Sequence, residues 1–186
     1  LGLLSNGNIH SHVDHSEALI RHAFQAGIRR CYLHALLDGR DVGVQSALDY
    51  TEPFEQLFSE LKSQRTDIDY AFASGGGREV VTMDRDNNWK KVEAGWKVHV
   101  KGDSENRFPS IRNAIEHFRK LDPEIIDQDI PGFVIVRNGE AVTKIEDQHA
   151  LIFTNFRSDR ASEFTEAILA DDFPHFERKA RPKVMF

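Results

Sequence analysis

The chain has 186 residues, of which 40% are hydrophobic and 29% are charged, a mixture typical of a single globular domain. Its formal net charge of -6 argues against nucleic acid and membrane surfaces as partners, because both carry negative charge and would repel it. The single cysteine, Cys31, rules out an intramolecular disulfide and no apolar run reaches the length of a membrane span, so we expect a cytoplasmic protein.

Short apolar runs alternate with helical patterns along the chain, which is typical of an α/β architecture. In chain order we expect strands at 1–4, 31–37, 70–73, 133–136, 141–145 and 150–154, and helices at 16–26, 51–61, 89–96, 111–118 and 161–168. Asn138-Gly139 is a strong signal for a two-residue hairpin, so the sheet should be mixed. The pattern therefore predicts a three-layer α/β/α domain with a mixed sheet and helices on both faces.

Four polar clusters fall where an apolar run ends. They comprise residues 8–12, 38–41, 74–78 and 155–160. Ligands of α/β sheets collect beyond the carboxyl ends of the strands, and arginine forks match carboxylate and phosphate oxygens. We therefore expect an anion site built from these clusters together. Taken alone, Arg157 and Arg160 are better explained by a surface salt bridge with Asp159, and residues 38–41 by a loop with capping carboxylates.

Three of the clusters suggest particular roles. Asp41 beside Arg40 fits a general acid/base with an anion held close to it. The three glycines before Arg78 would let backbone N–H groups approach a bound anion. Arg157 and Arg160 lie three residues apart, a spacing that lets them share one face of a helix.

The histidine cluster leaves two interpretations open. His10, His12 and His15, with Asp14 between them, have the composition of a metal site, which would indicate a metal-dependent hydrolase. The rest of the chain offers no partner with ligand-like spacing. The histidines would equally cap a helix and bind an anion.

Five segments, in order, resemble the cofactor-independent phosphoglycerate mutases. They are Gly-Leu-Leu-Ser-Asn-Gly-Asn-Ile-His-Ser-His at 2–12, Asp-Gly-Arg-Asp at 38–41, the Gly-Arg and Met-Asp-Arg-Asp block at 73–86, the hairpin strand at 133–136, and the segment 147–160 with Asn-Phe-Arg-Ser-Asp-Arg. The spacing from Arg78 to Arg85 is one residue longer than in many bacterial members. The similarity covers nearly the whole chain.

The resemblance implies a two-domain enzyme of glycolysis and gluconeogenesis that interconverts 3-phosphoglycerate and 2-phosphoglycerate through a phosphoserine. Residues 1–186 match its inserted substrate-binding, or phosphotransferase, domain, which holds and reorients the glycerate. The motifs of the alkaline-phosphatase-like domain, which carries the serine and two divalent metal ions, usually manganese, are absent. The chain begins at Leu1 and stops in an apolar run at 184–186, so we expect a fragment of a longer protein, inactive alone.

The resemblance also implies roles for individual residues. His10 contacts the phosphoryl group, and Asp41 is the acid/base for the glycerate hydroxyls. The residues expected to bind carboxylate and phosphate oxygens are Arg40, Arg78, Arg85, Arg157 and Arg160. The expected partners are phosphoglycerate and the phosphatase-like domain of the same polypeptide, with no metal ligand and no cofactor in this chain. The alternatives are a metal-dependent hydrolase using His10, His12 and His15, or a non-catalytic anion-binding module.

Overall fold

A computed structural model describes all residues of the chain, 1–186. Its centre is a six-stranded sheet in the order β1-β2-β3-β5-β4, with β6 paired to β5. The strands are β1 (Gly2–Leu3), β2 (Arg30–Leu37), β3 (Asp69–Gly77), β4 (Arg107–Phe108), β5 (Phe133–Arg137) and β6 (Glu140–Ala141). Strands β1, β2 and β3 are parallel, and β5 is antiparallel to β3, so the predicted mixed sheet is confirmed.

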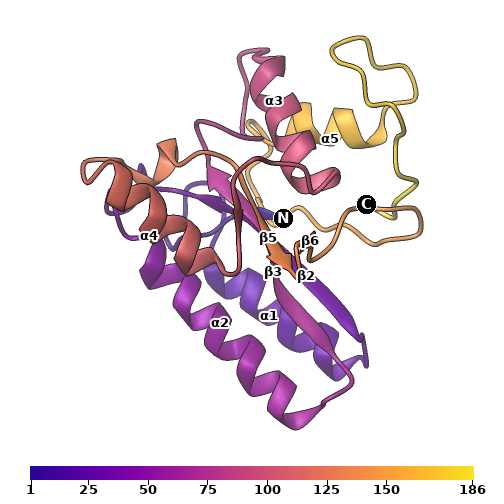
Figure 1. Ribbon diagram of the computed structural model, residues 1–186. Coiled ribbons are helices and arrows are strands. Elements are labelled where there is room, and N and C mark those ends of the chain that lie inside the picture. Colours follow the sequence, from indigo (N-terminus) through magenta and orange to yellow (C-terminus); the bar gives the residue numbers. More distant parts are fainter.

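Helices cover both faces of this sheet, which confirms the predicted three-layer architecture (Figure 1). The helices are α1 (Val13–Gln25), α2 (Ala47–Gln64), α3 (Trp89–Gly95), α4 (Ile111–Leu121) and α5 (Ser162–Leu169), and α3 continues into the π-helix η1 (Trp96–Val100). A short 3-10 turn, η2, spans Asp127–Asp129. None of the helices is both long and apolar enough to cross a membrane.

Two hydrophobic cores lie on opposite faces of the sheet. The larger core has 20 buried residues and packs α1, α2 and α4 against the sheet, and the second has 13 and packs α3, η1 and α5. Alternation along β2 divides its side chains between them: Leu33, Ala35 and Leu37 enter the larger core, whereas Leu36 enters the second. The C-terminal part of the strand is therefore buried on both faces, with His34 as its one polar side chain, and the polar loop follows Leu37.

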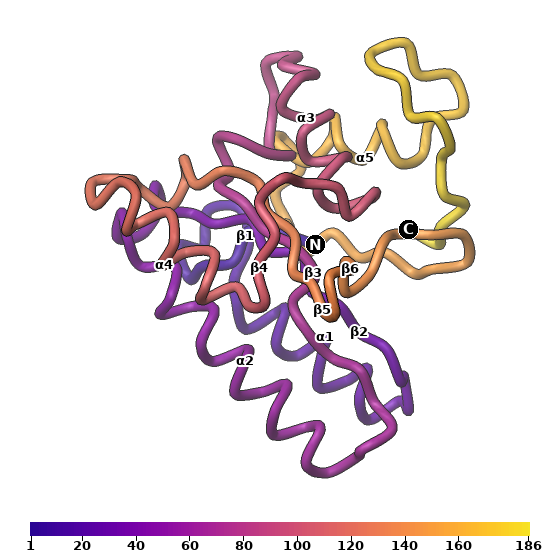
Figure 2. The backbone as a smooth tube through the Cα atoms, viewed as in Figure 1, coloured from indigo at the N-terminus to yellow at the C-terminus, as the bar shows by residue number.

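The hairpin prediction is confirmed in its turn but not in the length of its second strand. Asn138 and Gly139 have positive φ angles of 53° and 84°, as a type I′ turn requires. The strand after them ends at Ala141. The strand expected at 150–154 is wrong, because Ala150 forms only an isolated bridge with Met185, and Figure 2 shows the end of the chain returning to that segment.

The predicted anion-binding role of the glycines before Arg78 is also wrong, because they belong to β3. A Cβ atom on Gly75 would lie 2.4 Å from the ring of Phe133, and one on Gly77 would lie 2.1 Å from the carbonyl oxygen of Gln128. The N–H of Gly77 already donates to the carbonyl of Ile130 at 2.8 Å. These glycines therefore allow neighbouring backbone to pack closely against the strand.

Candidate functional site

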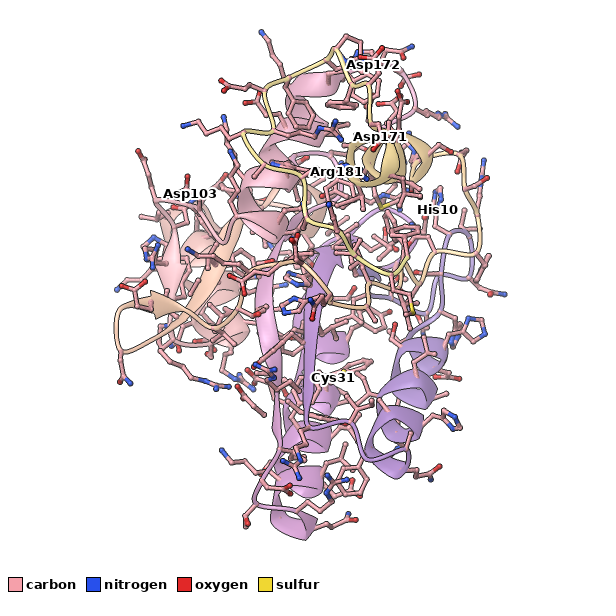
Figure 3. All side chains as sticks on the ribbon, turned by 90° about the vertical axis from the view of Figure 1, so that its right-hand side faces the viewer. His10, Cys31, Asp103, Asp171, Asp172 and Arg181 are labelled. Carbon is pink, nitrogen blue, oxygen red and sulfur yellow. The ribbon has the colours of Figure 1, made fainter.

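The four polar clusters meet at one edge of the sheet. The parallel strands β1, β2 and β3 end there, and the loops after them carry His10, Asp41 and Arg78. The segment before α5 joins them, since the N–H groups of Phe156 and Arg157 donate to the carbonyl oxygen of His10 at 2.9 Å and 3.3 Å. Figure 3 shows His10 at the end of the sheet opposite Cys31, which lies near the start of β2.

Arg78 is the buried centre of this edge, with a side chain only 1% exposed. Its Nη1 donates to Asp38 Oδ1 at 2.7 Å and to Asp41 Oδ2 at 2.5 Å. Since strand β3 places Arg78 directly beside the loop after β2, the guanidinium fixes both carboxylates of that loop. Asp41 keeps an 18% exposed side chain, so its carboxylate remains accessible from the edge.

Asp38 fixes the backbone of the loop that follows β2. It accepts hydrogen bonds from Ser5 Oγ at 2.6 Å and from the backbone N–H groups of Arg40 and Asp41 at 3.3 Å and 3.1 Å. Burial alone would raise the pKa of Asp38, but the hydrogen bonds from Ser5 and Arg78 lower it below its usual value. Asp38 is therefore ionised at neutral pH and acts as the internal counter-ion of Arg78.

Another carboxylate, that of Asp159, contacts three of the predicted site residues. Its Oδ2 lies 3.0 Å from Arg157 Nη2 and 3.3 Å from Arg85 Nη1, and its Oδ1 lies 3.5 Å from His10 Nδ1. His10 is 4% exposed, and burial together with the positive charge of Arg78 lowers the pKa of its ring. The negative charges of Asp159 and Asp41 oppose that shift.

The carboxylate of Glu79 lies close to the remaining two arginines. Its Oε1 lies 3.6 Å from both Arg40 Nη1 and Arg160 Nη1, and its Oε2 lies 3.1 Å from Lys91 Nζ. Lys91 comes from α3 and also approaches Asp84 at 3.4 Å. Glu79 Oε1 is buried and accepts no hydrogen bond within the chain. Both guanidiniums therefore lie near Glu79 Oε1 without donating a hydrogen bond to it.

The structure thus places all seven predicted residues at this edge: His10 and the five arginines each lie within 3.6 Å of a carboxylate, and Asp41 is itself one of these carboxylates. Arg157 and Arg160 do not share a helix face, because α5 begins only at Ser162 and the two side chains pair with different carboxylates. The structure contains the ion pair of Arg157 with Asp159 that the sequence offered as the alternative to anion binding. Arg40, Arg85 and Arg157 are about half exposed, so their forks are open to solvent.

Sequence reasoning missed two charged residues of this edge, Glu79 and Lys91. Glu79 directly follows Arg78, and a carboxylate next to a candidate anion-binding arginine was a usable signal. Lys91 carried no signal, because it lies on a separate helix and only the packing of α3 beside the sheet brings it near.

The histidines of the first loop do not converge as metal ligands. His12 is the N-cap of α1 and accepts a hydrogen bond from the N–H of Asp14 at 3.3 Å. His15 lies against the ring of Phe156, with centroids 5.9 Å apart. No group of three or more His, Cys, Asp or Glu side chains in the chain is placed to hold a metal ion. The structure therefore favours helix capping and loop packing over the hydrolase interpretation.

Two cavities lie away from this edge. One of about 860 Å³ runs between β2, α1 and residues 141–154, and one of about 190 Å³ lies between α2, β3 and residues 109–111. Neither is lined by any of the seven predicted residues. The seven predicted residues therefore belong to the charged edge and not to either of these cavities.

Fold and site together define a three-layer α/β domain that presents carboxylate-paired arginines at the carboxyl edge of its parallel strands. A family model described as the N-terminus of BPG-independent PGAM matches residues 1–186. The chain therefore belongs to the 2,3-bisphosphoglycerate-independent phosphoglycerate mutase family, as the sequence motifs indicated.

Individual relatives agree with this assignment. A protein of Leptospira interrogans named "Probable 2,3-bisphosphoglycerate-independent phosphoglycerate mutase" is 50% identical over 187 residues, which is all of this chain and 34% of that protein. The mutase of Trypanosoma brucei brucei is 39% identical over 188 residues, again 34% of its length. A crystal structure of Leishmania mexicana phosphoglycerate mutase superposes with a TM-score of 0.94 at 42% identity, covering 98% of this chain and 33% of that one. The chain thus spans about a third of these relatives.

Proposed function

We propose that this chain is the substrate-binding, phosphotransferase domain of a phosphoglycerate mutase, and that it holds and reorients the glycerate between 3-phosphoglycerate and 2-phosphoglycerate. The observation that carries the proposal is the convergence of His10 and the five arginines with Asp41 at one edge of the sheet. The family assignment supplies the substrate, which is an anion with both a carboxylate and a phosphate.

The arginines fit such a substrate in both charge and exposure. Arg40, Arg85 and Arg157 present half-exposed guanidiniums, each of which can bind two oxygens of a carboxylate or phosphate. Arg160 is mostly buried beside them and is held by Glu79. Phosphoryl transfer depends mainly on positioning and on charge stabilisation, and guanidiniums fixed by carboxylates supply both.

Asp41 has the position of the acid/base in this proposal. Its Oδ2 accepts a hydrogen bond from Arg78, which fixes the carboxylate, while its side chain remains partly exposed. It would remove the proton of the glycerate hydroxyl that attacks the phosphoryl group. It would return a proton to the hydroxyl oxygen from which the phosphoryl group departs.

We assign the remaining chemistry to the rest of the polypeptide. There a serine would accept the phosphoryl group as phosphoserine, in a phosphatase-like domain that holds two divalent ions, manganese by the family resemblance. His10 would contact the phosphoryl group from this side. The reaction is a step of glycolysis and gluconeogenesis, which places the protein in the cytoplasm.

The test compares phosphoglycerate binding and turnover in two proteins. The full-length protein should convert 3-phosphoglycerate to 2-phosphoglycerate with manganese present, whereas residues 1–186 alone should bind phosphoglycerate weakly and convert none. Arg160→Ala should weaken binding, and the control Arg112→Ala, on α4 and paired with Glu52 and Glu116, should not. Binding without turnover by the full-length protein would identify a non-catalytic anion-binding module instead.

A further inference from the structure

Two buried polar atoms at the charged edge have no hydrogen-bond partner and face each other. They are Nδ1 of His10 and Oδ1 of Asp159, which lie 3.5 Å apart. A buried donor or acceptor without a partner costs free energy. We therefore expect a state of the protein in which these two atoms form a hydrogen bond. Bonds that serve catalysis are often long in an unliganded enzyme and shorten when the substrate binds.

The position of the proton on His10 decides whether this pair attracts or repels. With the proton on Nε2, the lone pair of Nδ1 would face an ionised carboxylate oxygen in a buried place. With the proton on Nδ1, the ring donates to Asp159 instead. Burial alone would raise the pKa of Asp159, but Arg157 and His10 keep it below its usual value, so the carboxylate is ionised and the second arrangement is favoured.

The surroundings hold both residues in this orientation. Oδ2 of Asp159 is held by Arg157 at 3.0 Å and by Arg85 at 3.3 Å, which directs Oδ1 toward the ring. The carbonyl of His10 accepts the N–H groups of Phe156 and Arg157, so the backbone of the histidine is tied to the segment that carries Asp159. Asp159 cannot turn away without breaking its contacts with the two arginines, and burial restricts the ring of His10, which is 4% exposed.

We propose that Asp159 is a positioning residue that accepts a hydrogen bond from the Nδ1–H of His10 and so leaves Nε2 as the nitrogen that meets the phosphoryl group. The proposal rests on the function proposed above and assigns to Asp159 a task that it performs through His10. When the phosphoryl anion arrives, Nε2 takes up a proton from solvent, and the imidazolium lies between two anions. No covalent bond between heavy atoms forms or breaks in this step.

The charges that face the ring determine what removing Asp159 does. Arg78 and Arg157 disfavour a proton on His10, and Asp159 and Asp41 favour it. Asp159→Asn removes one of the two favourable charges, and an opposite charge at this distance shifts a pKa by about one unit or more. We therefore expect the pKa of His10 to fall by about one unit in that variant. The side-chain amide introduced by the substitution can donate to Nδ1, so the neutral ring should also change to the Nε2–H tautomer.

The experiment uses full-length protein with 15N-labelled histidine and long-range proton–nitrogen spectra, which distinguish the two tautomers directly. The His10 signals are assigned by their loss in His10→Gln. At pH 8 the parent should carry the proton on Nδ1, and Asp159→Asn should carry it on Nε2. The control Asp103→Asn, at an exposed position remote from His10, should change neither the tautomer nor the pKa (Figure 3). Thermal melts check that each variant is folded.

A proton on Nε2 in the parent would overturn the proposal, as would a tautomer that Asp159→Asn leaves unchanged. If Asp159→Asn does not fold, Asp159→Glu provides the second measurement, because its displaced carboxylate should keep the Nδ1–H tautomer. Added 3-phosphoglycerate separates this proposal from the proposed function. Tautomers as expected with no response of His10 to 3-phosphoglycerate support the positioning role and refute phosphoglycerate binding at His10.

Discussion

Replacement of Arg78 by methionine tests the buried centre of the charged edge. Methionine replaces the unbranched aliphatic part of the arginine side chain but removes the guanidinium that donates to Asp38 and Asp41. Asp38 would remain ionised in a site where its side chain is 1% exposed and would have lost its counter-ion. The sequence alone placed Arg78 at the end of a glycine-rich cluster and did not indicate that its side chain is buried.

The magnitude follows from the burial of the pair. Removing one partner of a buried ion pair costs about 3–5 kcal/mol, and most of this cost should come from Asp38, since Asp41 is partly exposed. For a chain of this size each kcal/mol lowers the melting temperature by roughly 2–4 °C, so a fall of roughly 6–20 °C is expected. The exposed Arg40→Met, which loses only a 3.6 Å contact with Glu79, should change stability by less than about 1 kcal/mol.

The pH dependence gives a second check on the same variant. The pKa of Asp38 is lowered in the folded parent, so its ion pair stabilises above the unfolded pKa and that contribution is lost as pH falls through the folded pKa. In Arg78→Met the pair is gone at every pH. The difference in stability between parent and variant should therefore be largest at neutral pH and should shrink below about pH 4.

Urea unfolding followed by tryptophan fluorescence, to which the 1% exposed Trp96 contributes, measures both effects at pH 7.5 and at about pH 3, below the usual pKa of an aspartate. If Arg78→Met unfolds within 1 kcal/mol of the parent at pH 7.5, Arg78 is not the counter-ion that this edge requires. A difference that stays constant between the two pH values would show that the loss comes from packing and not from charge.

The other predictions concern the full-length protein and the isolated chain. Asp41→Asn should lower kcat by roughly 100- to 10,000-fold with little change in substrate affinity, and near-parental turnover by folded protein would move the acid/base elsewhere. Arg160→Ala should weaken phosphoglycerate binding roughly 10- to 100-fold, measured by calorimetry. Residues 1–186 alone should show no mutase activity and no stoichiometric metal by elemental analysis. Gly77→Ala should lower the melting temperature, because its Cβ would lie 2.1 Å from the carbonyl oxygen of Gln128.

The layers and the grouping of the site were predictable because they depend on local patterns. The apolar run that ends at Leu37 and the Asn138-Gly139 turn each specify their structure from a few neighbouring residues. Strand ends then predict where the loops meet, since parallel strands finish at one edge. The sequence motifs then indicated which residues of these loops to expect at that edge.

Other features could not be predicted from the sequence, because they depend on residues that lie far apart along the chain. The same glycine triplet fits an anion-binding loop or a crowded strand, and only the ring of Phe133 and the backbone at Gln128 decide between them. Arg157 and Arg160 have helical spacing, but the helix starts later and each side chain turns to a different carboxylate. The place of Lys91 depends on how α3 packs, which no local pattern specifies.

The carboxylates among the arginines have a consequence for how an anion enters and leaves this edge. Five arginines and Lys91 make six cations, and they face the five carboxylates of Asp38, Asp41, Glu79, Asp84 and Asp159. The edge by itself therefore carries little self-repulsion, and its guanidiniums are oriented before any ligand arrives. In the proposed function, binding would be an exchange in which the ligand takes over the contacts that Glu79 makes with Arg40 and Arg160. On release Glu79 would again be the counter-ion of these arginines, so the departing ligand would not leave bare charges.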